Sequence, residues 1–179
     1  QVLVVLEKLL GPDHPNVAST LEAVASIREY QNRFAEGEAL RKRAIAINER
    51  AYGTEHLNVA LSLQGLGHLY RLQNRLEEAL PLLSRAVRLA EKTLGPAHPA
   101  LAAYLAEVAD LHKTRKQFAE AEGLYKRALQ ALETTGILDP VVVDVQAIRV
   151  LQSLTGLYQS SGRHVDARNR SVLHLGRYV

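Results

Sequence analysis

Three histidines at equal spacing are the residues that could bind a metal ion. They are His14, His56 and His98, 42 residues apart, and each follows a glycine by three positions. Imidazole nitrogens are common zinc ligands, but all ligands of one zinc ion lie about 2 Å from it. Each histidine precedes a predicted helix start in a different repeat, and stacked helices lie about 8–10 Å apart. We therefore predict that the histidines pack at helix starts and that the chain binds no metal or other cofactor.

Catalytic motifs are missing from the sequence. It contains no glycine loop that would hold a phosphate, no nucleophile elbow and no HExxH helix. Serine, histidine and aspartate occur without a spacing that indicates a catalytic site. The acidic pair Glu77 and Glu78, like Glu120 and Glu122, occupies ordinary exposed helix positions. We predict that the chain is not an enzyme.

Basic residues occur in clusters, which raises the possibility of nucleic-acid binding. The clusters are Arg41, Lys42 and Arg43; Arg85, Arg88 and Lys92; and Lys126 and Arg127. Acids such as Glu38, Glu49, Glu91 and Glu122 alternate with them, and the formal net charge is only +3. We place these residues on the second helices, the outer face of the predicted fold, and no aromatic side chains that could stack on bases line the predicted groove. Nucleic-acid binding through this face is kept as an alternative that the sequence disfavours.

Composition and hydropathy narrow the class of protein further. The 179 residues include no cysteine, so the chain has no disulfide and no thiolate ligand. No apolar run reaches the roughly 18 residues of a membrane span. We expect no membrane contact and a cytoplasmic location. The opening QVLVVLEKLLG resembles the end of a helix, and we interpret the chain as a fragment of a longer protein.

The repeat that contains the histidines extends along the whole chain. The phrase GPDHPNVA begins at Gly11, and related phrases are GTEHLNVA from Gly53, GPAHPALA from Gly95 and, less regularly, GILDPVVV from Gly136. A fixed period in this range is typical of a protein whose units bury their apolar faces against their neighbours. The sequence therefore favours a binding scaffold over an enzyme.

Each repeat is predicted to be a helical hairpin. In the first repeat Pro15 fits the opening turn of a helix, and Val17, Leu21, Ala25 and Ile27 form an apolar face. The polar segment 31–33, Gln-Asn-Arg, interrupts this pattern. We expect the helix to end there, because asparagine tolerates the left-handed conformation that often ends a helix. A second helix is expected over residues 34–52, before the next glycine.

The repeats divide the chain into one helix and four hairpins within a single domain. We place the end of a preceding unit at residues 1–10 and the repeats at 11–52, 53–94, 95–135 and 136–179. The fourth repeat is irregular, since the segment from Pro140 to Arg163 is about five residues longer than its counterpart from Pro99 to Gln117. Its first helix is predicted to be longer than the others, or bulged.

At these positions the chain resembles the tetratricopeptide repeat family. Small residues recur in the first helix of each hairpin and at two positions of the second, namely Ala25, Gly67 and Ala109, then Gly37, Ala79, Ala121 and Ala167, and Ala44, Ala86 and Ala128. The 42-residue unit is similar to the version found in kinesin light chains. The resemblance implies an all-α, right-handed α-solenoid of stacked antiparallel hairpins that serves as a protein-interaction scaffold or adaptor.

In this family the first helices line a concave groove that binds a partner protein or peptide. Alignment of the repeats places there Ser19, Glu22, Ser26, Glu29, Leu61, Gln64, His68, Arg71, Glu107, Asp110, Lys113, Arg149 and Gln152. A peptide of mixed charge with small apolar anchors would suit these residues. The paired asparagines common in kinesin light chains are replaced here, for example by Gln64 and Gly65, so the sequence does not specify the ligand.

Self-assembly is the other function that the sequence leaves open. Each terminal face of a repeat stack is complementary to the interior of the same stack. Leu173 and Leu175 would be exposed at one end, and a homo-oligomer formed through the terminal helices is the alternative to partner binding.

Overall fold

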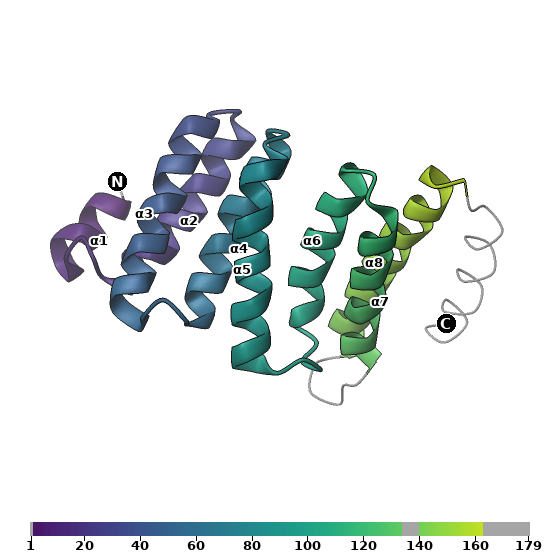
Figure 1. The fold of residues 1–179 in the computed structure, drawn as a ribbon. Coiled ribbons are helices and arrows are strands. Elements are labelled where there is room, and N and C mark those ends of the chain that lie inside the picture. The colour runs from purple at the N-terminus through teal and green to yellow at the C-terminus, as the bar shows by residue number, and fades with distance from the viewer. Residues whose placement is uncertain (1, 134–139, 163–179) are drawn as a thin grey trace. The chain divides into compact units, whose positions relative to one another are not determined.

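A computed structural model describes residues 2–133 and 140–162 of the chain, and this part is all helical (Figure 1). The side chains of residues 140–144 are outside the description. The chain divides into two compact units, Gln1–Thr93 and Leu94–Val179, which we call unit 1 and unit 2. None of the helices in the described part is both long and apolar enough to cross a membrane.

Unit 1 consists of one helix followed by two antiparallel hairpins (Figure 1). Helix α1 covers Val2–Leu10. The first hairpin pairs α2, Pro15–Tyr30, with α3, Phe34–Tyr52, and the second pairs α4, Leu57–Leu72, with α5, Leu76–Leu94. In the first hairpin, both helices begin and end where the sequence predicts.

The three spaced histidines accept hydrogen bonds from backbone N–H groups at or just before helix starts. His14 Nδ1 accepts a hydrogen bond of 3.1 Å from the Asn16 backbone N–H, and His56 Nδ1 accepts one of the same length from Asn58 N–H. In unit 2, His98 Nδ1 accepts one of 3.2 Å from Ala100 N–H, in the turn before the helix that begins at Leu101. The imidazoles of His14 and His56 thus pair with backbone donors that a helix start leaves unsatisfied. In the described residues, no group of three or more His, Asp or Glu side chains is placed to hold a metal ion.

The turns inside the hairpins use the left-handed backbone conformation. Asn32 and Asn74 have φ of 60° and 59°, and Lys116 takes the corresponding place in unit 2 with φ of 60°. Asparagine adopts this region more readily than residues with longer side chains. Gly53, which ends α3, has φ of 83° and ψ of 163°, a conformation largely confined to glycine.

The core at the start of unit 1 joins α1 to the first hairpin. Val17 and Leu21 of α2 and Ile47 of α3 are buried together, and Leu3 and Leu6 of α1 pack against them. Helix α1 therefore packs on the first hairpin through Leu3 and Leu6. Ile27 does not belong to this face: it is 54% exposed, because the buried positions of α2 are 17, 18, 21 and 25 and position 27 lies on a different side of the helix. Its inclusion in the apolar face was wrong.

Small residues allow close contact between the helices. Ala79 of α5 is fully buried, and a Cβ placed on Gly67 of α4 would overlap the Leu83 side chain. Ala121 and Ala128 of unit 2 are also fully buried. Larger side chains at such positions would cost about 1–3 kcal/mol through overpacking.

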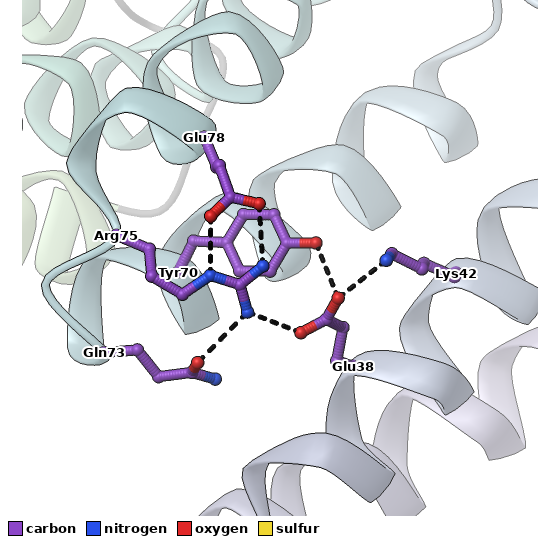
Figure 2. A network of polar contacts seen from close by, with 6 residues as sticks. All are labelled: Glu38, Lys42, Tyr70, Gln73, Arg75 and Glu78. Carbon is purple, nitrogen blue, oxygen red and sulfur yellow. Dashed lines mark hydrogen bonds and ion pairs between the residues drawn. The ribbon is translucent and has the colours of Figure 1, made fainter.

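A polar network joins the two hairpins of unit 1 (Figure 2). It consists of Glu38, Lys42, Tyr70, Gln73, Arg75 and Glu78. Glu38 accepts hydrogen bonds from Lys42 at 2.6 Å, Tyr70 at 2.9 Å and Arg75 at 2.6 Å. The Arg75 guanidinium also lies 4.0 Å from the centre of the Tyr70 ring. One carboxylate of α3 thus holds the end of α4 and the start of α5.

Unit 2 contains the three remaining described helices. They are α6, Leu101–Thr114; α7, Phe118–Glu133; and α8, Pro140–Ser160. Helix α8 has 21 residues, compared with 14 in α6, and is the longer helix that the sequence predicts for the fourth repeat. Arg163, Ala167, Leu173 and Leu175 lie outside the described residues.

Candidate functional site

The first helices of unit 1 bring predicted groove residues together, because α2 and α4 are in contact. Helix α2 carries Ser19, Glu22, Ser26 and Glu29, and α4 carries Leu61, Gln64, His68 and Arg71. Residues three or four apart share one face of a helix. The described contacts of these side chains show which of them are available to a ligand.

Arg41 of α3 engages the predicted groove acids of α2. Its Nε and Nη2 donate to the two carboxylate oxygens of Glu29, at 2.5 and 3.0 Å. Its Nη1 donates to Glu22 Oε2 at 2.5 Å, and Nη2 also contacts Ser26 Oγ at 3.3 Å. Arg41 is only 7% exposed, so its placement in a basic cluster on the outer face was wrong.

Glu22 and Glu29 therefore have different environments. Glu29 uses both oxygens on Arg41, and its side chain is 9% exposed. Glu22 uses one oxygen, Oε2, and its side chain is 25% exposed. Glu29 acts mainly in the internal packing of the hairpin, whereas Glu22 keeps part of its carboxylate exposed.

Gly65 of α4 makes room for this ion pair. A Cβ at position 65 would overlap Arg41 Nη1 and would approach Glu22 Oε2 to 3.3 Å. The absence of a side chain at position 65 allows the guanidinium to lie against the backbone of α4.

The charged form of Glu22 is incompletely stabilised. Burial raises the pKa of this carboxyl above its ordinary value, although the nearby Ser62 hydroxyl and the charge of Arg41 act in the opposite direction. The neighbouring Glu29 carboxylate adds to the rise in pKa. Glu22 would accordingly be stabilised by a further cationic or hydrogen-bond-donating partner.

A pocket of about 390 Å³ opens beside Glu22 within unit 1. It is lined by Pro15, Asn16, Ser19, Glu22, Asn48, Tyr52, Asn58, Leu61 and Ser62. Three predicted groove residues, Ser19, Glu22 and Leu61, meet here. The described lining combines polar and apolar surface and contains no lysine or arginine. This pocket is the candidate functional site.

Sequence reasoning missed the polar floor of the pocket. Asn48 of α3 donates a hydrogen bond of 2.9 Å to Ser62 of α4, and both residues are buried. Ala90 and Leu132 stand at the positions that correspond to Asn48 in the next two repeats, and both are buried. A polar residue where the other repeats have apolar ones was the sequence feature that could have revealed this site.

The remaining predicted residues of α4 lie beyond the pocket. Arg71 Nη2 and His68 Nδ1 are 3.3 Å apart, and both side chains are partly buried. Gln64 is half-buried. These residues extend the α4 face but do not line the pocket.

The predicted groove residues of unit 2 are partly engaged within that unit. Tyr125, at the position that corresponds to Arg41, donates its hydroxyl hydrogen to Asp110. Lys113 Nζ donates to the Ser153 carbonyl at 3.4 Å, and Glu107 is buried. Arg149 and Gln152 of α8 are exposed. Of the predicted residues in unit 2, these last two present the most open side chains.

Several cations predicted for the outer face are paired with acids. Arg43 lies 2.6 Å from Glu7, Arg85 lies 2.7 Å from Glu49, and Lys126 lies 2.6 Å from Glu122. Lys92 is paired with Glu55. These ion pairs reduce the positive charge that the outer face offers to a polyanion.

Comparison with known proteins identifies the repeat. A tetratricopeptide repeat model matches residues 17–92 and 70–134, which together span more than half of the chain. No curated protein matches the sequence.

Several solved structures share the fold. BtubC (BKLC) from P. vanneervenii is 16% identical with a TM-score of 0.75, and the match covers 87% of this chain and 61% of that protein. This chain therefore spans less than two thirds of the length of that BtubC structure. A Podosopora anserina putative kinesin light chain with nearly identical TPR-like repeats is 24% identical with a TM-score of 0.73, covering 94% and 78% of the two chains. A substituted form of that kinesin light chain is 22% identical with a TM-score of 0.76, covering 100% and 85% of the two chains.

Proposed function

We propose, because this chain belongs to the tetratricopeptide repeat family, that unit 1 binds an extended segment of a partner protein along α2 and α4. Repeats of this family generally mediate protein–protein interactions and are typically non-enzymatic. The observation that carries the proposal is the pocket in which Ser19, Glu22 and Leu61 meet. Exposed Arg149 and Gln152 are the residues of unit 2 proposed for the same role.

The site is preformed by contacts between helices. Arg41 ties α3 to α2 through Glu22 and Glu29, and the Asn48–Ser62 hydrogen bond ties α3 to α4. Side chains that are already ordered lose little conformational entropy when a ligand binds. Most of the conformational entropy lost on binding would come from ordering the partner segment.

The pocket offers both kinds of contact that an extended segment needs. Asn16 and Asn58 at its edge can donate and accept hydrogen bonds. Leu61 and Tyr52 present apolar surface and are 53% and 42% exposed. A segment with polar backbone groups and an apolar portion on one side chain would complement this lining.

The test uses two leucines of α4 that have the same exposure. Leu61 lines the pocket and Leu72 does not, yet both are 53% exposed. Partners captured from the native proteome by the wild-type chain should be lost with Leu61→Gln and retained with Leu72→Gln, which remove apolar surface without changing the charge. Circular dichroism would confirm that both variants keep their helices. Equal capture by both variants would contradict binding at this pocket.

Self-association is a second candidate function, favoured by exposed apolar side chains on α1. Val2, Val5 and Leu9 are more than half exposed, and such a surface can mediate contact between proteins. Light scattering of the purified chain should then show a mass that rises with concentration, and Val5→Glu with Leu9→Glu should abolish the rise. A constant monomer mass would rule out this candidate. No observation favours nucleic-acid binding, since several basic residues of the outer face are paired with acids.

A further inference from the structure

We propose that the pocket of unit 1 binds a basic side chain, lysine or arginine, of the partner segment, with Glu22 as its counter-charge. This inference rests on the proposed function, because it names the chemistry that the same site would select. It follows from the charge balance around Arg41, the hydrogen-bonding groups of the lining and the apolar rim.

The charges around Arg41 leave one carboxylate incompletely neutralised. One guanidinium serves two acids, and Glu29 takes two of its hydrogen bonds while Glu22 takes one. The group of three residues thus carries one more negative than positive charge. Among the described residues, no lysine or arginine lines the pocket to correct this imbalance. A cation brought by a ligand would neutralise the excess negative charge beside Glu22, where partial burial strengthens the attraction between the two charges.

The lining supplies the acceptors that such a cation requires. Glu22 Oε1 is buried near Ser62 without a hydrogen bond of good geometry. Asn48 uses its amide N–H on Ser62, which leaves the side-chain oxygen as its accepting atom. Asn16 and Asn58 add further amide oxygens at the pocket wall. The ammonium group of lysine has three N–H donors and the guanidinium of arginine has five, and neither group contains an acceptor. Such a side chain therefore needs acceptors from the pocket.

The rim of the pocket suits the aliphatic part of a basic side chain. Pro15, Tyr52 and Leu61 line the pocket with apolar atoms. The Tyr52 ring is stacked on His56, with 4.6 Å between centroids and 16° between planes, so its orientation is fixed by a neighbour. Lysine and arginine bury their methylene groups against apolar surface while the charged end remains in polar surroundings.

The same lining disfavours other classes of side chain. An acidic side chain would place a second negative charge beside Glu22. An apolar side chain would displace water from the asparagine and glutamate acceptors without replacing its hydrogen bonds, which is unfavourable for buried polar groups. The pocket therefore selects against both classes as well as for a cation.

The test measures binding of single-residue probes to the full chain by NMR. The probes are the N-acetyl methylamides of lysine, arginine, norleucine and glutamate, and the signals are the side-chain amides of Asn16, Asn48 and Asn58. Lysine or arginine should shift these signals saturably, whereas norleucine and glutamate should not. Glu22→Gln should weaken binding of the basic probes by roughly tenfold or more, since hydrogen bonds to charged groups are the stronger ones.

Three further variants separate charge recognition from folding. Glu36→Gln makes the same change on an exposed carboxylate of α3 outside the pocket and should leave binding unchanged. Leu61→Lys adds a positive charge at the rim without touching Arg41 and should also weaken binding of the basic probes. Leu72→Lys makes the same change on an equally exposed leucine outside the pocket and should leave binding unchanged. If Glu22→Gln alters the fold, the comparison of Leu61→Lys with Leu72→Lys still decides the question.

Equal shifts with norleucine and lysine, or no pocket shifts with either basic probe, would overturn the charge preference. A folded Glu22→Gln chain with unchanged affinity would do the same. These results would leave a Leu61-dependent partner, and with it the proposed function, intact. Selective binding of basic probes without any Leu61-dependent partner would contradict the proposed function but not the chemistry of the pocket.

Discussion

The Tyr158 hydroxyl donates a hydrogen bond of 3.0 Å to Glu122 Oε1 in unit 2. It repeats the bond of 2.9 Å from Tyr70 to Glu38 in unit 1. In each case a lysine four residues after the glutamate is an ion-pair partner at 2.6 Å, Lys126 in unit 2 and Lys42 in unit 1. The longer helix α8 does not disturb this arrangement.

These repeated contacts connect successive helices inside each unit, α3 with α4 in unit 1 and α7 with α8 in unit 2. The tyrosine near the end of a first helix reaches the glutamate of the preceding second helix. At the corresponding positions of the intermediate repeat, the sequence has Leu80, Ser84 and His112, which cannot form the same set of bonds. The network of Figure 2 is therefore found in particular repeats and is not common to every 42-residue unit.

The Glu38 network should make stability depend on acid pH. Burial opposes ionisation of Glu38, but hydrogen bonds from Lys42, Arg75 and Tyr70 outweigh it and lower the pKa to about 2 from 4.5. Because the folded state lowers this pKa, the contribution to stability is complete above about pH 4.5 and is lost as the pH falls toward 2. Glu38→Gln should lower the free energy of unfolding by about 1–2 kcal/mol at pH 7.

Urea-unfolding midpoints at pH 7, 4 and 2.5 would test this prediction. The gap between wild type and Glu38→Gln should narrow as the pH falls. Glu55→Gln, which removes an exposed ion pair with Lys92, is the control and should change the midpoint much less. A gap that stays constant with pH would show that the carboxylate charge of Glu38 is not the source of the effect.

Two glycine-to-alanine substitutions should have opposite effects. Replacing a helical glycine by alanine raises the free energy of unfolding by about 0.5–1 kcal/mol where the added methyl group has free space. Gly123 of α7 is such a position, since no atom lies within 4 Å of the added Cβ. At Gly65 the Cβ would displace the Arg41 guanidinium from Glu22. We expect Gly123→Ala to raise the thermal midpoint and Gly65→Ala to lower it. A higher midpoint for both would show that Arg41 relocates without cost.

The boundaries of the elements could be predicted from sequence because they depend on local chemistry. Pro15, the turn at 31–33 and Gly53 set the limits of α2 and α3, and the structure has the same limits. Such features act within a few residues and need no knowledge of the tertiary structure.

The placement of Arg41 failed because a charged residue beside Lys42 and Arg43 suggests an exposed helix face. The corresponding positions of the next two repeats hold Leu83 and Tyr125, and both are buried. Comparison between repeats was more informative here than the charge of the neighbours. Asn48 marks the region of the pocket in the sequence, but the set of residues that lines it could not be predicted, because the lining depends on how side chains of α2, α3 and α4 orient together.

Replacement of a capping histidine should destabilise its helix. His14 Nδ1 accepts the Asn16 N–H at the start of α2, so His14→Ala should cost about 1 kcal/mol in free energy of unfolding. His14→Asp supplies another acceptor and a charge favourable at a helix start, and it should retain the stability of wild type. Chemical denaturation of the three proteins measures the difference. Equal losses in both variants would assign the role of His14 to packing instead of capping.

The left-handed turn residues offer a reciprocal test of backbone strain. Lys116 and Asn74 occupy equivalent turns with φ of 60° and 59°, but only asparagine is suited to this conformation. Lys116→Asn should therefore stabilise the chain by about 0.5–1 kcal/mol, and Asn74→Lys should destabilise it by a similar amount. Hydrogen exchange of the amides in α4 and α7 would locate each change to its own unit. If both substitutions shifted stability in the same direction, side-chain contacts and not the backbone conformation would determine the preference at these turns.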